Sequence, residues 1–215
     1  MIRSDLSKIS VVIPAFNEEN RITAVIRKAK PFVNEILVID DCSSDNTVEC
    51  AKRAGARVLS NDKNLGYLET IKKGLRNAQG DIIITMDADG EHDPTDIPLL
   101  VKPVLEGHAD LVLGTRQKIP RISERFLNWL TRLKIPIKDS GTGFRVIKKE
   151  FAEKLELKGK CTCGILVLEI DSLGGKIVEV PITIRIICKK GKIAWNHASQ
   201  FFHILRWILF KMKKF

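Results

Sequence analysis

Two carboxylates stand close together directly after an apolar stretch of the sequence. Asp87 and Asp89 follow the run 81–86 (DIIITM), and Glu91 and His92 come next. Neighbouring carboxylates repel each other, so a compensating cation is expected beside them. A hard divalent ion such as Mg²⁺ or Mn²⁺ prefers oxygen ligands and neutralises a leaving nucleoside diphosphate. Glu91 and His92 could complete its shell, although a solvated turn with helix-capping acids is the alternative.

Further acids follow two other apolar runs. Glu18 and Glu19 come after the run 9–14, and Asp40 and Asp41 end the run that begins at residue 35. Capping of the next helix explains one acid at the second position, because Asp is a favoured N-cap residue. Helix capping does not explain the second, adjacent acid. A carboxylate there is expected to accept a hydrogen bond from a nucleobase N–H.

The pattern of apolar residues places these acids in a fold. Continuous apolar runs are typical of parallel strands buried on both faces, and apolar residues at helical spacing alternate with them. This alternation predicts an α/β fold with a mostly parallel central sheet. Ligands of such sheets bind beyond the carboxyl ends of the strands, where the acids lie. The expected strands are 9–14, 35–40, 58–60, 81–86, 111–114 and 177–181, and the expected helices are 22–29, 48–54 and 71–78.

The composition is that of a globular protein with a basic surface. The chain has 215 residues, 44% hydrophobic and 29% charged, with a formal net charge of +10. This length fits one domain with a full core. Residues 1–10 contain no signal-peptide core, which predicts a cytoplasmic protein. Motifs of three other classes are missing, namely the Walker P-loop, GxGxxG and the GxSxG elbow.

The cysteines are expected to be reduced, because five is an odd number without framework spacing. Cys161 and Cys163 are separated by one residue, one short of the usual metal knuckle, and no second pair follows. We therefore favour a structural role for this pair over a metal role. His108, His197 and His203 are scattered, and each is interpreted as a surface or satisfied histidine.

The C-terminal segment differs from the rest of the chain. Residues 185–215 contain no acid, and apolar residues recur at helical spacing from 198 to 215 around Arg206. The apolar stretch is too short to span a bilayer, which needs about 20 residues. An amphipathic basic helix suits the headgroup boundary of an anionic membrane. We expect a catalytic domain over 1–197 and a membrane-contacting helix over 198–215. Packing of this helix on the domain's own core is the alternative.

Together, several motifs in the expected order over roughly residues 8–185 resemble the family 2 glycosyltransferases. Within that family, the chain is most similar to the dolichyl-phosphate mannose synthase branch. The chain departs from the branch pattern at several positions, among them Glu91, where Gln is common, and Cys42, where Gly is usual. The motifs are VVIPAFNEE (11–19), VIDDCSSDNT (38–47), NLG (64–66), MDADGEH (86–92), GTR (114–116), SGTGFR (140–145) and VEVP (178–181).

The resemblance implies a GT-A type nucleotide-binding fold and a set of site residues. Asp89, Asp139 and Arg116 would be catalytic, with Arg116 facing the donor and Asp139 the acceptor. Asp87, Asp89 and Glu91 would hold the metal. The nucleotide sugar would contact Pro14, Phe16, Glu18, Ile39, Asp41, Asp87, Ala88, Asp89, Arg116 and Lys189. Lys189 belongs to a basic loop, 189–192, that we expect to close over the donor, with a solvated surface loop as the alternative.

The implied reaction is metal-dependent, inverting transfer from a GDP- or UDP-sugar to a polyprenyl phosphate at the cytoplasmic face of the cell membrane. A lipid phosphate is already anionic and attacks without a base. Asp139 is the best candidate base, but it equally suits capping or orienting Arg145. A hydroxyl acceptor on a glycan and a sugar-nucleotide nucleotidyltransferase remain alternatives. Nucleic-acid binding is disfavoured, because acids at the strand ends repel phosphates and aromatic residues make up only 6% of the chain.

Overall fold

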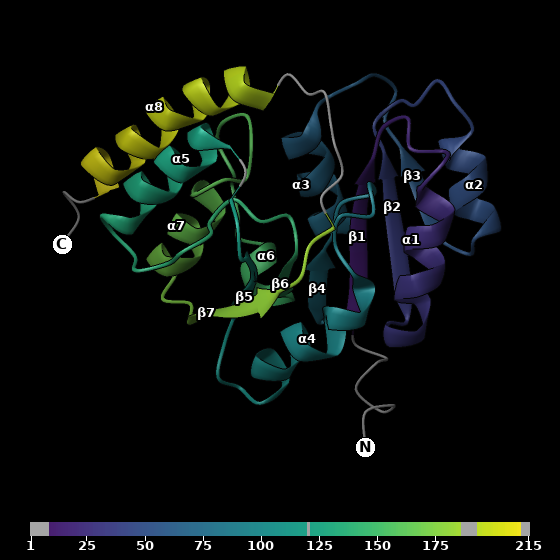
Figure 1. Cartoon of the computed structure of the whole chain (residues 1–215), viewed down its shortest axis with the longest axis horizontal. Coiled ribbons are helices and arrows are strands. Elements are labelled where there is room, and N and C mark those ends of the chain that lie inside the picture. Colours follow the sequence, from purple (N-terminus) through teal and green to yellow (C-terminus); the bar gives the residue numbers. More distant parts are fainter. Residues whose placement is uncertain (1–8, 120, 186–192, 212–215) are drawn as a thin grey trace.

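The computed structural model describes residues 9–119, 121–185 and 193–211. Its centre is a seven-stranded sheet with the order β3-β2-β1-β4-β6-β5-β7 (Figure 1). β6 runs antiparallel to β4 and β5, and the remaining pairs are parallel. The strands are β1 (Ile9–Ala15), β2 (Glu35–Asp40), β3 (Arg57–Ser60), β4 (Ile82–Thr85), β5 (Leu111–Arg116), β6 (Arg145–Lys148) and β7 (Ile177–Ile182).

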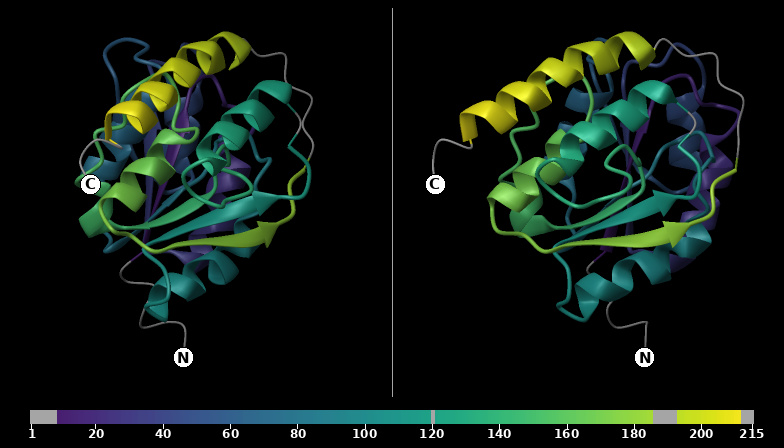
Figure 2. Two further views of the ribbon diagram at one scale, coloured as in Figure 1. Left: turned by 90° about the vertical axis from the view of Figure 1, so that its left-hand side faces the viewer. Right: turned by 60° about the vertical axis from the view of Figure 1, so that its left-hand side comes forward.

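Helices cover both faces of this sheet (Figures 1 and 2). α1, α2 and α4 share one apolar core with the sheet, and α3, α5, α7 and α8 contribute to the other. Alternate residues of β1 divide between the cores: Val11 and Ile13 belong to the first and Val12 to the second. The helices are α1 (Ile22–Ala29), α2 (Thr47–Arg53), α3 (Tyr67–Asn77), α4 (Ile97–Leu105), α5 (Ile122–Arg132), α6 (Lys149–Ala152), α7 (Ile165–Ser172) and α8 (Ile193–Lys211), with 3₁₀ turns η2 (Lys30–Phe32) and η3 (Pro94–Asp96).

The expected α/β class with a mostly parallel sheet is confirmed, and so are the six expected strands, to within two residues at most ends. β6 is the strand that the sequence analysis did not include. The motif 140–145 was not assigned to a strand, but its last residue, Arg145, begins β6. β6 is short and lies between β4 and β5, so neighbours distant in sequence determine its pairing.

The C-terminal helix exists and begins at Ile193, so the expected boundary between residues 197 and 198 falls inside α8. α8 lies along α5, and its Ile204 and Ile208 are buried in the core (Figure 2). Among the described residues, no helix has the length and apolar character needed to cross a membrane. The apolar residues of α8 therefore serve the fold on one side, while Phe202 and Leu209 are exposed on the other.

The close approach of α3 to β1 depends on Gly74. A Cβ placed there would lie 2.2 Å from Val12 Cγ1 and 3.2 Å from Ile39 Cγ1. Helix propensity alone would favour Gly74→Ala by about 1 kcal/mol. We expect the opposite sign, a loss of about 1–3 kcal/mol, because overpacking a dense core forces the helix outward.

Urea unfolding monitored by circular dichroism measures this change. The control is the double variant Gly74→Ala/Val12→Ala, compared with Val12→Ala alone. The added alanine should cost much less where the Val12 methyls are absent. An equal cost in both backgrounds would contradict the contact as the cause.

Candidate functional site

The loops after β1 and β2 are fastened together at the carboxyl edge of the sheet. Asn17 donates its backbone N–H to Ser43 Oγ at 2.9 Å, and its Oδ1 accepts from the Ser44 N–H at 2.9 Å. Asn17 has φ = 55°, a left-handed conformation that Asn tolerates better than most residues. The Glu18 N–H donates to Thr47 Oγ1 at 2.7 Å. The acids after β1 are therefore held beside those after β2, as the strand order requires.

Asp41 organises a third loop at this edge. It is 5% exposed, and its carboxylate accepts hydrogen bonds from Asn61 Nδ2, Leu65 N and Gly66 N, each at 2.8 Å. A carboxylate offers about four acceptor positions, so one remains for a further donor. One acceptor position of Asp41 is thus left for the expected hydrogen bond from a nucleobase. The other three acceptor positions hold the loop that precedes α3.

The other residues expected at the nucleoside differ in exposure. Phe16 is 47% exposed beyond β1 and can reach a ligand. Pro14 is buried within β1, Ala88 is buried after β4, and Ile39 is fully buried against α3. The side chain of Ile39 therefore packs in the core that lies below the carboxyl edge of the sheet.

Asp87 and Asp89 lie beyond β4, as expected, but in different surroundings. The side chain of Asp87 is 29% exposed, whereas Asp89 is 4% exposed and accepts the Glu91 N–H at 2.9 Å. A Cβ at residue 143 would lie 2.3 Å from Asp87 Oδ2, so only glycine there leaves space for this carboxylate.

Asp87 has two side chains beside it: Tyr67, which the sequence did not assign to the site, and His92, which was expected in the metal shell. Tyr67, at the start of α3, is 36% exposed as a residue, but its hydroxyl is buried beside Asp87; this burial first, and then the Asp87 charge, raise the pKa of Tyr67 well above its ordinary value. The Tyr67 hydroxyl therefore stays protonated as a donor. His92 Nδ1 lies 4.0 Å from Asp87 Oδ2, and burial lowers the pKa of His92 despite the attraction of Asp87 and Asp89. The position of Tyr67 directly after the motif 64–66 was the available signal.

The donor set fits a divalent cation of the expected kind. His92 Nδ1 is buried without a hydrogen-bond partner and faces Asp87, an arrangement that a cation would complete. The carboxylates of Asp87, Asp89 and Glu91 do not form a converged three-ligand group in the described part of the chain. Mg²⁺ commonly takes one or two carboxylates and obtains its remaining ligands from substrate phosphates and water. The site therefore suits an ion that arrives with a diphosphate.

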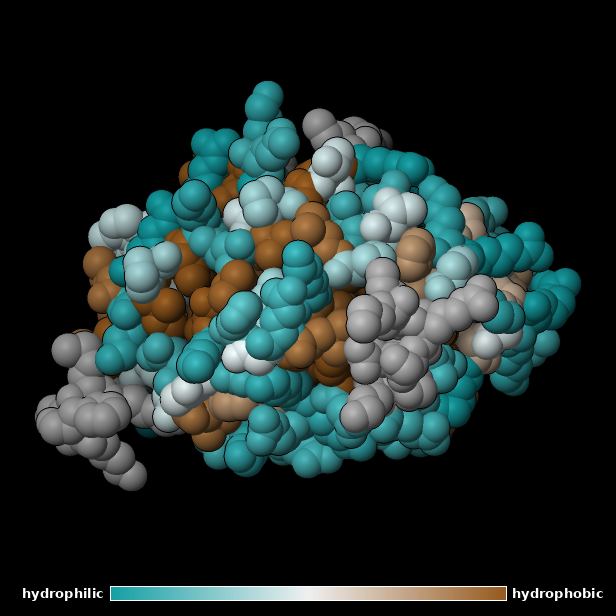
Figure 3. Space-filling model, turned by 90° about the horizontal axis from the view of Figure 1, so that it is seen from below, coloured by the Kyte–Doolittle hydropathy of each residue, from teal (hydrophilic) through white to brown (hydrophobic). Residues whose placement is uncertain are grey.

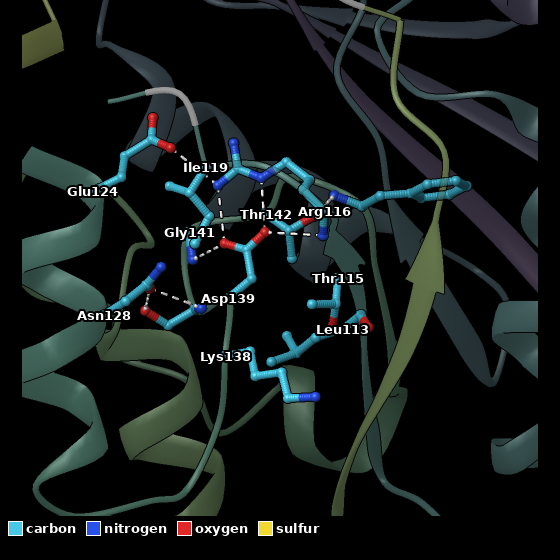
Figure 4. Close-up of polar contacts among 12 residues, drawn as sticks. Leu113, Thr115, Arg116, Ile119, Glu124, Asn128, Lys138, Asp139, Gly141 and Thr142 are labelled. Atoms are coloured by element: carbon cyan, nitrogen blue, oxygen red, sulfur yellow. Dashed lines mark hydrogen bonds and ion pairs between the residues drawn. The ribbon is translucent and has the colours of Figure 1, made fainter. Parts of the chain in front are cut away.

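Arg116 and Asp139 form a buried ion pair (Figure 4). Arg116 Nε donates to Asp139 Oδ2 at 2.7 Å, and Arg116 Nη2 to Oδ1 at 2.9 Å. The Arg116 N–H also donates to Oδ2, at 3.2 Å. Glu124 of α5 lies 3.0 Å from Arg116 Nη2 and also pairs with Arg121. The end of β5 is thus bound to α5 and to the segment before β6.

This pairing bears on the roles expected for Asp139, which were a base, a cap or a partner of Arg145. Burial acts to raise the pKa of Asp139, but the hydrogen bonds and charge of Arg116 outweigh it and hold the pKa below its ordinary value. A carboxylate held in this way is a poor base. The expectation that Asp139 orients Arg145 is wrong, because Arg145 Nη1 donates to Thr162 Oγ1 at 2.8 Å, while Arg116 occupies Asp139.

The backbone around Asp139 is also held by side chains. Glu179 Oε1, from β7, accepts the N–H groups of Lys138 at 2.7 Å and Asp139 at 3.0 Å. Asn128 Oδ1, from α5, accepts the Ser140 N–H at 2.9 Å. The motif 178–181 contained Glu179, but only the fold reveals its partner. Lys189, expected over the donor, lies outside the described residues.

The fold, an α/β fold with a mostly parallel central sheet, is of the GT-A type. Residues 10–165 match the model of the family described as "Glycosyl transferase family 2". The chain therefore belongs to glycosyltransferase family 2, as its motifs predicted.

Two curated relatives illustrate the range of this family. An uncharacterized protein of Methanocaldococcus jannaschii is 35% identical over 197 residues, covering 80% of this chain and 86% of the relative. The dolichol-phosphate mannosyltransferase of Pyrococcus furiosus is 29% identical and covers 93% of this chain. This chain spans only 64% of the length of that second relative.

Among solved structures, the glucosyl-3-phosphoglycerate synthase of Mycobacterium tuberculosis is similar over nearly the whole chain. Its complex with phosphoglyceric acid has a TM-score of 0.82 and 27% identity, covering 94% of this chain and 80% of the synthase. A complex with Mn²⁺, UDP-glucose and phosphoglyceric acid has a TM-score of 0.80 and 25% identity.

The Arg116–Asp139 pair makes a prediction for stability. Asp139→Asn should lower the free energy of unfolding by about 3–5 kcal/mol at neutral pH, because it removes one partner of a buried ion pair. The folded pKa of Asp139 is below the unfolded value, so its stabilisation is present above the unfolded pKa and is lost as the pH falls through the folded one. The difference between wild type and variant should therefore shrink in acid.

Urea unfolding across a pH series checks this expectation. Glu69→Gln is the matched control, because Glu69 is half-exposed and pairs with Lys72 only at the surface. That variant should differ from wild type by less than about 1 kcal/mol. A similar loss of unfolding free energy for the two substitutions would contradict the stabilising role of the buried Arg116–Asp139 pair.

Proposed function

We propose that the protein is a metal-dependent, inverting glycosyltransferase that moves a sugar from a GDP- or UDP-sugar to a polyprenyl phosphate. The donor would lie across the carboxyl edge, with its base near Phe16, Glu18 and the remaining acceptor position of Asp41. Its diphosphate would lie at Asp87 and Asp89. The nucleotide, Mn²⁺ and sugar in the solved mycobacterial synthase support the donor class.

Each side chain at the donor would have a simple task. A divalent cation, when bound, would neutralise charge on the leaving diphosphate. Asp89 and Asp87 would hold that cation, with His92 and the neighbouring Glu91 beside them. Tyr67 would keep the Asp87 carboxylate oriented through its protonated hydroxyl. Arg116, 10% exposed and held rigidly by Asp139, would position the sugar or phosphates without moving during the reaction.

The observation that carries the choice of acceptor is the engagement of Asp139. A hydroxyl acceptor needs a general base, and the best candidate of the sequence is committed to Arg116. A phosphate acceptor is anionic at neutral pH and attacks the sugar without losing a proton to the protein. The dolichol-phosphate mannosyltransferase among the relatives supports the same acceptor class.

An acceptor screen with purified protein tests this proposal. Polyprenyl phosphate should accept sugar from one of the nucleotide-sugar donors in the presence of Mn²⁺ or Mg²⁺. Phosphoglyceric acid is the comparison acceptor, because the solved synthase binds it. Transfer to phosphoglyceric acid or to a glycan hydroxyl, with none to polyprenyl phosphate, would contradict the proposed acceptor while leaving the donor chemistry in place.

Metal dependence gives a further prediction. Asp89→Asn should reduce transfer about 10²–10³-fold, on the scale of about 3–4 kcal/mol for losing one group that stabilises developing charge. EDTA should abolish the activity of the wild-type enzyme, and added Mn²⁺ should restore it. Initial rates measure both effects, with Glu106→Gln, at the exposed residue that follows α4, as the control. Undiminished transfer in EDTA would refute the metal's role.

The proposal also includes a peripheral membrane contact, for which the outer surface of α5 and α8 is suited. Phe126 and Trp129 of α5 stack with ring centroids 5.6 Å apart. Phe126 also stacks on Phe201 of α8 at 5.2 Å, and Phe201 meets Phe202 edge-on. We call these four side chains the aromatic ridge. Exposed aromatic side chains on paired helices suit the headgroup boundary, where the polyprenyl acceptor would be located.

Apolar surface is not confined to this ridge. The face seen from below in Figure 3, away from α8, also carries hydrophobic residues, interrupted by hydrophilic ones. Leu99 and Leu105 of α4 are 51% and 43% exposed. The ridge differs in having four linked rings on two adjacent helices, and α4 supplies a matched comparison.

Flotation with anionic liposomes tests the ridge. The double variant Trp129→Ser/Phe202→Ser should float much less than wild type, because both side chains are more than half exposed and their loss removes apolar area from the contact. The control Leu99→Ser/Leu105→Ser should float like wild type. If all three proteins float equally, or if none floats, the aromatic ridge is not the membrane contact.

A further inference from the structure

A second group of metal-ligating side chains lies apart from the carboxylates. Cys161, Cys163 and His197 place one ligand atom each within 4.8 Å of one another. Of the residues that the structure describes, no others form such a three-ligand group. Cys163 and His197 are 8% and 3% exposed, and Cys161 is partly exposed. The cysteines come from the segment before α7 and the histidine from the start of α8.

The spacing is close to that of a zinc site. Zinc binds thiolate sulfur at about 2.3 Å and imidazole nitrogen at about 2.0–2.1 Å, so tetrahedral ligands lie roughly 3.6–3.8 Å apart. Cys163 Sγ and His197 Nε2 are 4.0 Å apart. The three ligand atoms, which lie within 4.8 Å of one another, must therefore move closer together when an ion binds.

The imidazole of His197 is oriented as a metal ligand would be. His197 Nδ1 lies 2.7 Å from Ser123 Oγ of α5, while Nε2 faces Cys163. A ligating histidine usually donates its second ring N–H to an oxygen, which fixes the tautomer and the ring plane. In the tautomer whose Nδ1–H donates to Ser123 Oγ, the Nε2 lone pair is directed at Cys163.

The cysteine segment is held in place from the same helix. Gln200, fully buried and one turn after His197, accepts the Lys160 N–H at 2.9 Å and the Cys161 N–H at 3.3 Å through Oε1. Its Nε2 donates to the Cys163 carbonyl at 3.4 Å. α8 thus presents a ligand and a clamp to the two cysteines, so the site is formed before any ion binds.

We propose that Cys161, Cys163 and His197 bind one Zn²⁺ ion, with a water molecule as the fourth ligand on the partly exposed Cys161 side. Thiolate and imidazole ligands favour zinc, whereas carboxylates favour Mg²⁺ and Mn²⁺. The ion is therefore separate from the one proposed at Asp89, and this inference does not rest on the reaction.

The ion joins α8 to the acceptor side of the fold. The Gly164 N–H, next to Cys163, donates to the Ser140 carbonyl at 3.4 Å, and Ser140 follows Asp139. A zinc ion between Cys163 and His197 therefore ties the beginning of α8 to the turn that carries the Arg116–Asp139 pair. Zinc should raise the melting temperature of the chain, because it binds the folded site and not the separated segments.

Metal content of the full chain tests the proposal. Protein purified without chelator, or reconstituted with zinc and desalted, should retain about one zinc per chain. Cobalt should give thiolate charge-transfer absorption. Cys163→Ser and His197→Ala should lose the zinc and the absorption, whereas Cys42→Ser, Cys50→Ser and Asp89→Asn should keep both. Ser123→Ala should retain every ligand but bind zinc about 10–100-fold more weakly.

A measurement on the unmodified sequence guards against variants that fail to fold. Zinc should protect Cys161 and Cys163 of the native chain from alkylation, read by peptide mass spectrometry, and leave Cys42 reactive. No zinc or cobalt uptake by the wild-type chain would overturn the proposal. Equal alkylation with and without zinc would do the same, as would uptake that survives both Cys163→Ser and His197→Ala.

Discussion

The buried pair of Arg116 and Asp139 is the interaction on which the second half of the fold depends. A charge in the interior must be paired, and here a bidentate contact with three hydrogen bonds meets that need. Around it, Glu124 brings α5, and Glu179 brings β7 through the Asp139 backbone. This ion pair and the contacts around it thus fix the relative positions of β5, α5, β7 and the segment that leads into β6. The same contact holds the pKa of Asp139 below its ordinary value, which disfavours Asp139 as a base.

The first half of the fold solves a different problem, which is to gather acids at one edge of the sheet without letting them repel. Asp41 is satisfied by three donors of the 61–66 loop, and Asp89 by a backbone N–H. The Asp87 carboxylate instead keeps some exposure and faces the unpartnered nitrogen of His92. The more exposed acid of the pair beyond β4 therefore lies where a cation and diphosphate are proposed to bind.

Much of this arrangement could be predicted from the sequence, because it is local. The runs at 9–14, 35–40 and 81–86 are apolar throughout, which is what a strand buried on both faces requires. β6 was not predicted, because Val146 and Ile147 are its only apolar residues and its antiparallel partners come from β4 and β5. For the same reason, the choice of Arg116 over Arg145 as the partner of Asp139 could not be made from sequence. α8 begins at Ile193, before the apolar pattern of residues 198–215. Its buried residues include the polar His197 and Gln200, which a pattern of apolar residues does not reveal.

Those inward polar residues explain why the thiol cluster was not evident from spacing alone. Cys161 and Cys163 lack the separation of a metal knuckle, and His197 follows Cys163 by 34 residues. Only the packing of α8 along α5 brings His197 to the thiols and Ser123 to its other nitrogen. Ligand softness would then keep two ions apart in one small domain: carboxylates beyond β4 suit a hard ion that must leave with diphosphate, whereas thiolates suit an ion that stays. A lasting ion would be useful at the α8 junction, because that helix packs along α5 and carries half of the aromatic ridge proposed to contact the membrane.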